Sequence, residues 1–178
     1  MDVRRVLRAE DLTPGRKVVL VDRLGVLSRP LVRRAAASGR LVVFRHAVHG
    51  VGEAGWFQSA VEHDQLREFS CLPFKSFNEY WRADDLAFDA VETVYAVLKR
   101  HQKVPVSPLL ELYGDENVEL AFKKALLSCL AEFYRTVAAL HLFHQDGRQV
   151  VFCPSAAWEE VRLWLDLAEV RWQWPTEV

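Results

Sequence analysis

Short continuous hydrophobic runs along the chain alternate with longer stretches in which apolar residues recur at helical spacing. The first run, Lys17 to Asp22, follows the turn signal Thr13-Pro14-Gly15, and the second is Leu41 to Phe44. Continuous apolar runs of this length predict buried strands. Between them, a helical pattern starts with Pro30 in its first turn and stops at Gly39, where a C′ glycine belongs. Strand, helix and strand within ~30 residues predict a βαβ unit with parallel pairing.

The middle of the chain is expected to be mostly helical. After a short helix predicted within Trp56 to Phe69, apolar stripes predict a helix capped by Asp84 or Asp85 that ends near His101. A further helix is predicted from Gly114 to about His144, which at 1.5 Å per residue is ~40 Å long. We therefore expect residues 78–147 to form a mainly helical insertion or layer within one α/β domain spanning residues 1–178.

The last part of the chain returns to strand and helix. Gln149 to Cys153 predicts a third buried strand, Ser155 is a plausible N-cap for a helix over Ala156 to Leu167, and Val170 to Trp174 alternates with period two as a terminal strand would. The layout predicts an α/β fold, a Rossmann-like three-layer arrangement with a mostly parallel sheet and a helix-rich middle segment.

Composition restricts the class of protein more than its activity. The 178 residues carry 23 Lys and Arg against 24 Asp and Glu, and 51% are hydrophobic, which excludes a disordered chain and disfavours broad nucleic-acid binding. Three widely spaced cysteines favour a reducing compartment without a disulfide framework. The charged N-terminus and the lack of an uncharged apolar run of ~20 residues predict a cytoplasmic protein without a membrane span.

A glycine motif follows the second predicted strand. Gly50, Gly52 and Gly55 match G-x-G-x-x-G, a pattern that lets the backbone approach a phosphate at a helix N-terminus. The context departs from the dinucleotide-binding fingerprint, because a full βαβ unit precedes it and no buried strand is expected at Arg67 to Pro73. Glu53 would also place a negative charge beside the phosphate. The alternative is a strand-to-helix loop that binds nothing.

The segment from Val21 to Ser28 contains Asp22 directly after a strand, followed by Gly25-Val26-Leu27. It resembles motif one of the haloacid-dehalogenase-type phosphatases over about eight residues, and the resemblance implies that Asp22 matches the nucleophile. Leu24 stands where that family has its second aspartate, the general acid and base. The late strand ends in Cys153-Pro154-Ser155, without the paired acidic motif that holds magnesium. We therefore expect no phosphatase chemistry, and the alternative is a strand, a turn and a capped helix.

Polar residues gather where the predicted parallel strands end. In open α/β sheets, ligands bind outside the carboxyl ends of the strands, and histidine and arginine there would suit a phosphate or a carboxylate. The alternative is a solvated rim. The candidate ligand-binding residues are Asp22, Arg23, Arg45, His46, His49, Gly50, Gly52, Gly55 and Ser155.

No catalytic residues and no metal ligands can be assigned. The chain has no G-x-S-x-G elbow and no P-loop motif, and no cofactor is indicated. His141 and His144 could share a helix face, but their place in the last turn is explained by the helix dipole. Whether the protein is an enzyme stays open, and a transferase acting on a nucleotide- or sugar-type substrate is the enzyme class we favour.

Two functions compete on this evidence. The first is a Rossmann-like domain that binds a small anionic ligand containing a phosphate or a nucleotide, an architecture found in the N-terminal half of two-domain glycosyltransferases. The second is a non-catalytic interaction or scaffolding domain. Its interface would be Trp172 and Trp174 on an edge strand, covered by a second copy of the chain or by a further domain. The alternative is that both rings are buried against the helical layer of the domain itself.

Overall fold

The computed structural model describes residues 17–24, 29–47, 66–68, 77–101, 114–145 and 149–173. It divides the chain into two compact units. The first, here called the sheet unit, comprises Met1–Ser76 and Ala139–Ala156, and the second, the helical unit, comprises Phe77–Ala138 and Ala157–Val178.

Four strands of the sheet unit form one all-parallel sheet in the order β3-β2-β1-β4. All three strands predicted from continuous apolar runs are present, and the parallel βαβ pairing of the first two is confirmed. The α/β class is therefore confirmed. The third of these strands was predicted to be buried, which is wrong, because β4 lies at the end of the described strand order and its residues are half-buried or exposed. The strands are β1 (Val18–Leu24), β2 (Leu41–Ala47), β3 (Leu66–Glu68) and β4 (Val150–Cys153).

The short strand β3 corrects two predictions. A helix was expected within Trp56 to Phe69, but Leu66–Glu68 pairs in parallel with β2, with Leu66 opposite Val42. The expectation that Arg67 to Pro73 contains no buried strand is wrong at its start, because Arg67 and Glu68 belong to β3 and Arg67 is buried, whereas residues 69–73 lie outside the described residues. Three residues are too few to show a strand period, and a charged residue in the middle hides their burial.

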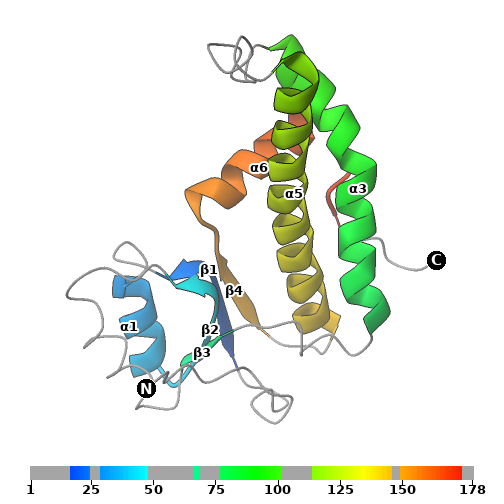
Figure 1. Cartoon of the computed structure of the whole chain (residues 1–178). Helices are drawn as coiled ribbons and strands as arrows, with labels where there is room; N and C mark the ends of the chain where they lie inside the picture. Colours follow the sequence, from blue (N-terminus) through cyan, green and yellow to red (C-terminus); the bar gives the residue numbers. More distant parts are fainter. Residues whose placement is uncertain are drawn as a thin grey trace, which may run out of the picture. The chain divides into compact units, whose positions relative to one another are not determined.

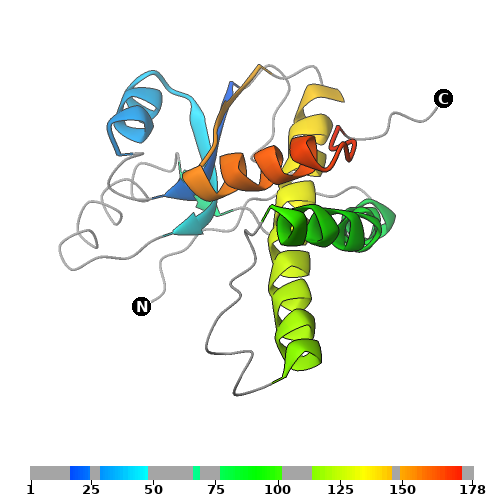
Figure 2. The same ribbon diagram turned by 90° about the horizontal axis from the view of Figure 1, so that it is seen from above.

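Helix α1 (Arg29–Ala37) packs against β1 and β2, on one face of the sheet (Figures 1 and 2). Gly39 follows the helix as the predicted C′ glycine, with a φ of 71° that suits glycine. The Arg40 amide donates to the Ala35 carbonyl at 3.1 Å. Strand residues alternate between the two faces of the sheet, and both faces are buried. Val19, Val21, Val42 and Phe44 belong to the core on the α1 side, while Val18, Leu20, Leu41 and Val43 fill the other face.

Three helices follow the prediction in place and type. They are α3 (Phe77–Arg100), α5 (Asp115–Gln145) and α6 (Ala156–Leu167), and most of each lies in the helical unit. The prediction that Asp84 or Asp85 caps a helix is wrong, because α3 starts at Phe77 and both residues lie inside it. Ion pairs of Arg135 with Asp84 and of Lys123 with Glu92 join α3 and α5 as antiparallel neighbours (Figure 1).

The prediction of a terminal strand is wrong for residues 170–173, the part of it that the structure describes. No strand forms across 170–173, and Trp172 packs its ring against Trp158 and Phe133 at centroid distances of 6.2 and 6.0 Å. Its indole N–H donates to Asp166 Oδ1 at 2.7 Å. Trp172 is therefore half-buried within its own unit and is not part of an edge strand. Trp174 lies outside the described residues.

Helix α5 is the longest element, with 31 residues. By length and composition its segment Glu116–His144 could cross a membrane, but 56% of the most apolar window is buried inside the structure. The core helix of a soluble protein passes the same test.

Candidate ligand site at the carboxyl ends of the strands

The order of the four described strands reverses at one point in the sheet unit. The chain proceeds from β1 to β2 to β3 in one direction and then places β4 on the other side of β1. The carboxyl ends of β1 and β4 therefore flank the point where the strand order reverses, which is where open α/β sheets bind their ligands.

A hydrogen bond joins the two strand ends that flank this point. The Ser155 hydroxyl donates to Asp22 Oδ2, although the two residues are 133 positions apart in the sequence. Asp22 lies near the end of β1, and Ser155 follows β4 immediately before α6 begins at Ala156. The structure thus brings together two of the predicted ligand-binding residues, and both are half-buried.

Basic positions lie beside this pair. Arg23 is exposed on β1, and the register of the sheet places it opposite His46 on β2. Arg45 precedes His46 in the same strand. The other candidate residues, His49, Gly50, Gly52 and Gly55, lie outside the described residues, so their part in a site stays a prediction.

Two neighbouring residues restrict the chemistry at these strand ends. Leu24, at the position of the second aspartate in the phosphatase motif, is buried in the core on the α1 side. Burial and the negative charge of Asp22 raise the pKa of the Cys153 thiol, which disfavours a nucleophilic thiolate. These two residues therefore disfavour phosphatase-type acid–base catalysis and thiol catalysis at these strand ends.

The near-zero net charge conceals a separation between the two units. The described residues of the helical unit contain thirteen Asp and Glu against eight Lys and Arg, so this unit is acidic. The described residues of the sheet unit carry only Asp22 and Glu68 as acidic groups. Their eight basic residues are Lys17, Arg23, Arg29, Arg33, Arg34, Arg40, Arg45 and Arg67. An anion would be attracted to the sheet unit.

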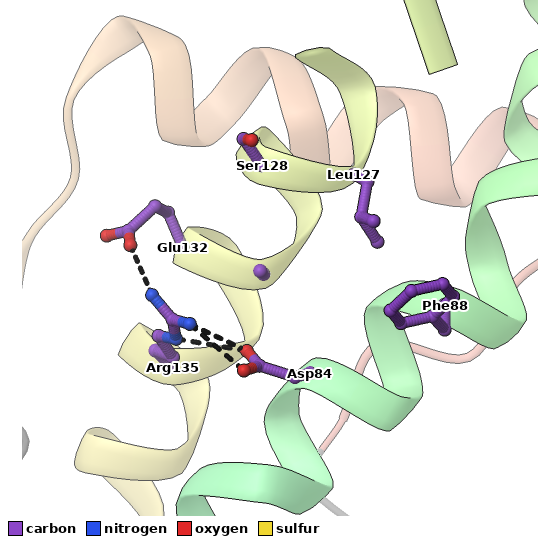
Figure 3. Close-up of a pocket in the computed structure, with 7 residues that line it drawn as sticks. Asp84, Phe88, Leu127, Ser128, Glu132 and Arg135 are labelled. Atoms are coloured by element: carbon purple, nitrogen blue, oxygen red, sulfur yellow. Dashed lines mark hydrogen bonds and ion pairs between the residues drawn. The ribbon is translucent and has the colours of Figure 1, made fainter. Parts of the chain in front are cut away.

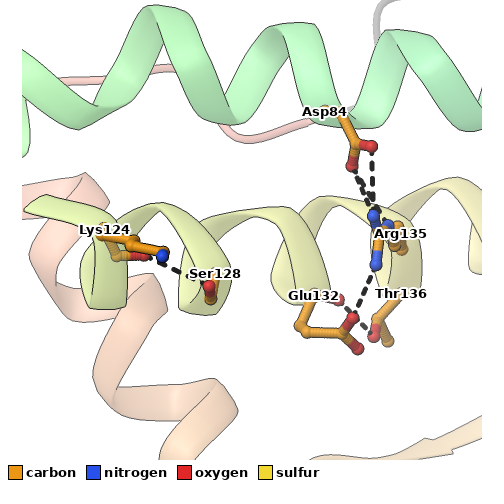
Figure 4. A network of polar contacts seen from close by, with 6 residues as sticks. All are labelled: Asp84, Lys124, Ser128, Glu132, Arg135 and Thr136. Atoms are coloured by element: carbon orange, nitrogen blue, oxygen red, sulfur yellow. Dashed lines mark hydrogen bonds and ion pairs between the residues drawn. The ribbon is translucent and has the colours of Figure 1, made fainter.

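A separate hollow of about 280 Å³ lies in the helical unit, between α3 and α5. Figure 3 shows Phe88 and Leu127 at its apolar side and Asp84 and Arg135 at its polar side. The Arg135 guanidinium binds both carboxylate oxygens of Asp84, at 3.1 and 3.0 Å, and also Glu132 at 2.7 Å (Figure 4). Each charged group in this network therefore has a partner. A heptad spacing of aromatic residues, Trp81 and Phe88, could have indicated this face from the sequence.

A buried tyrosine in the same unit predicts a loss of stability at high pH. The Tyr134 hydroxyl donates to the Arg171 carbonyl at 3.3 Å. Burial and the negative charge of Asp89 raise the pKa of Tyr134 to about 12. Because the folded state favours the neutral phenol, this stabilisation is complete below about pH 10 and is lost as the pH rises to about 12.

The measurement is urea unfolding of the wild type and of Tyr134→Phe at several pH values. Across this window the wild type should lose up to about 2–3 kcal/mol more than the variant, which cannot ionise at that position. Identical slopes in both proteins would show that Tyr134 ionises equally in the folded and unfolded states.

Comparison of the chain with protein-family models, with curated proteins and with solved structures found no match.

Proposed function

We propose that the sheet unit binds a small ligand carrying both a phosphate and hydroxyl groups, of the nucleotide or nucleotide-sugar class, at the carboxyl ends of β1, β2 and β4. The observation that carries the proposal is the hydrogen bond between Ser155 and Asp22 at the reversal of strand order. We include in this proposal a Rossmann-like three-layer fold for the sheet unit. The order β3-β2-β1-β4 is that of the first four strands of such a sheet.

The polar groups at this edge suit the two parts of such a ligand. The Asp22 carboxylate accepts hydrogen bonds and would bind ribose or sugar hydroxyls. The exposed Arg23 guanidinium would pair with a phosphate, together with Arg45, His46 and the glycine segment. A transferase acting on a nucleotide sugar is one enzyme class that needs both contacts.

Thermal unfolding of the full chain with a nucleoside diphosphate, a nucleotide sugar and inorganic phosphate tests the proposal. A ligand at 100 times its Kd should stabilise the protein by about 2.7 kcal/mol. Asp22→Ala should abolish most of the shift with the nucleotide sugar, whose hydroxyls it would bind, and should leave the weaker phosphate shift in place. Arg23→Gln should reduce all three shifts.

Asp85→Ala removes an exposed carboxylate of the helical unit and serves as the control, with shifts equal to those of the wild type. Since Arg23 is exposed, its replacement does not threaten folding and keeps the test informative even if Asp22→Ala unfolds. The proposal fails if none of the three compounds shifts the unfolding temperature, or if Arg23→Gln leaves every shift unchanged.

The exposed aromatic residues of the helical unit favour a second candidate function, a non-catalytic interaction domain. Trp81 and Phe88 lie seven residues apart on α3 and are 55% and 63% exposed. Phe88 lines the hollow between α3 and α5, and large exposed apolar side chains of this kind are typical of protein–protein contacts. A stable dimer by mass in solution, together with no ligand-induced shift, would favour this candidate over ligand binding.

A further inference from the structure

The sheet unit contains a hollow of about 670 Å³ between α1 and the edge strand β4. Its floor is apolar and consists of Val19, Leu31, Ala35 and Val151. Val19 and Val151 are paired in register, so they lie side by side on one face of the sheet. Helix α1 packs on β1 and β2 and leaves Val151 46% exposed. A volume of this size is within the range of small-molecule sites.

Two arginines line the same hollow. Arg34 comes from the last turn of α1, and Arg40 lies just after its glycine cap. No acidic residue lines the hollow among the residues that the structure describes. Neither guanidinium makes a hydrogen bond or an ion pair in the described part of the chain. The hollow thus combines an apolar lining, in which Val151 is exposed and Leu31 is half-buried, with two arginines that have no acidic partner among the described residues.

We propose that this hollow binds an amphiphilic anion, a molecule with one apolar chain or ring system and a carboxylate or phosphate head. The apolar part would cover Leu31 and Val151, which gains the free energy of removing their surface from water. The head would accept charge-assisted hydrogen bonds from Arg34 and Arg40. The site does not include Asp22 or Ser155 and is independent of the ligand proposed at the carboxyl ends of the strands.

Calorimetric titration of the full chain tests this proposal with decanoate and decyl phosphate, each below its micelle concentration. Decanol supplies the apolar chain without the charge, and inorganic phosphate supplies the charge without the chain. Both anionic amphiphiles should bind once per chain and at least about tenfold more tightly than either control. Equal affinity for decanol, or no binding of either amphiphile, would overturn the proposal.

Variants locate the binding within the unit. Arg34→Gln and Arg40→Gln should each weaken decanoate binding about tenfold, the effect of losing one charge-assisted hydrogen bond. Arg33→Gln is the matched control, because Arg33 is exposed on the same helix and does not line the hollow, so its affinity should stay unchanged. Val151→Asp should abolish decanoate binding through charge repulsion and loss of the apolar floor.

Two outcomes of the variant series would contradict a separate site. An equal loss in Arg33→Gln and Arg34→Gln would show that the anion follows the general positive charge of α1. A loss of decanoate binding in Arg23→Gln would show that the amphiphile binds at the carboxyl ends of the strands. Decanoate binding that persists in Arg23→Gln, while the nucleotide-sugar shift falls, supports two independent sites.

Discussion

Replacing Trp158 with alanine should lower the free energy of unfolding of the helical unit by about 3–5 kcal/mol, the range for deleting a buried aromatic side chain. Trp158 begins the buried face of α6 and is only 9% exposed. Its ring stacks on Phe133 of α5 at a centroid distance of 4.7 Å and meets Trp172 edge-on at 6.2 Å. The substitution therefore removes both a large buried surface and two favourable ring contacts.

Urea unfolding followed by far-ultraviolet circular dichroism measures this loss without relying on tryptophan fluorescence. Trp81→Ala is the matched control, because Trp81 is 55% exposed on α3 and its loss should cost less than about 1 kcal/mol. If both variants lost the same free energy, the aromatic cluster of Phe133, Trp158 and Trp172 would not be a core of this unit.

The same cluster shows where prediction from sequence reached its limit. The helix over Ala156–Leu167 was predicted to the residue, since a serine N-cap and a regular apolar stripe are local signals. The segment after it was predicted as a strand because Trp172 and Trp174 alternate with polar residues. What determines the position of Trp172 is instead a set of non-local contacts, with Phe133 of another helix and with Trp158. The alternation of apolar and polar residues along the sequence cannot predict such contacts.

The residues of the candidate ligand site could be predicted from the sequence, but the contact between Asp22 and Ser155 could not. Continuous apolar runs in the sequence place Asp22 and Ser155 at the ends of predicted strands. In open α/β sheets, ligands bind at the carboxyl ends of the strands. The pairing depends on strand order, and only the structure shows that β1 and β4 are neighbours. The arginines that line the hollow between α1 and β4 belong to no sequence motif. Arg33 and Arg34 are adjacent on α1, and only Arg34 lines the hollow beside the exposed Val151.

Leu20→Ala should be strongly damaging to the sheet unit, with a loss of about 2–5 kcal/mol in the free energy of unfolding. Leu20 is 0% exposed and lies in the central part of β1, opposite Val43 of β2 and Phe152 of β4. Both neighbouring strands hold its backbone, so the sheet cannot easily collapse into the cavity that the missing side-chain atoms leave. Amide hydrogen exchange of β1 and β2 would report the loss in this unit directly.

Val151→Ala provides the comparison within the same sheet. Val151 belongs to the edge strand and is 46% exposed, so its truncation should cost less than about 1 kcal/mol and leave the exchange of β1 nearly unchanged. Similar losses for the two variants would mean that β1 is not the buried centre of the sheet. That result would also remove the basis for both proposed sites, because each depends on β1 lying between β2 and β4.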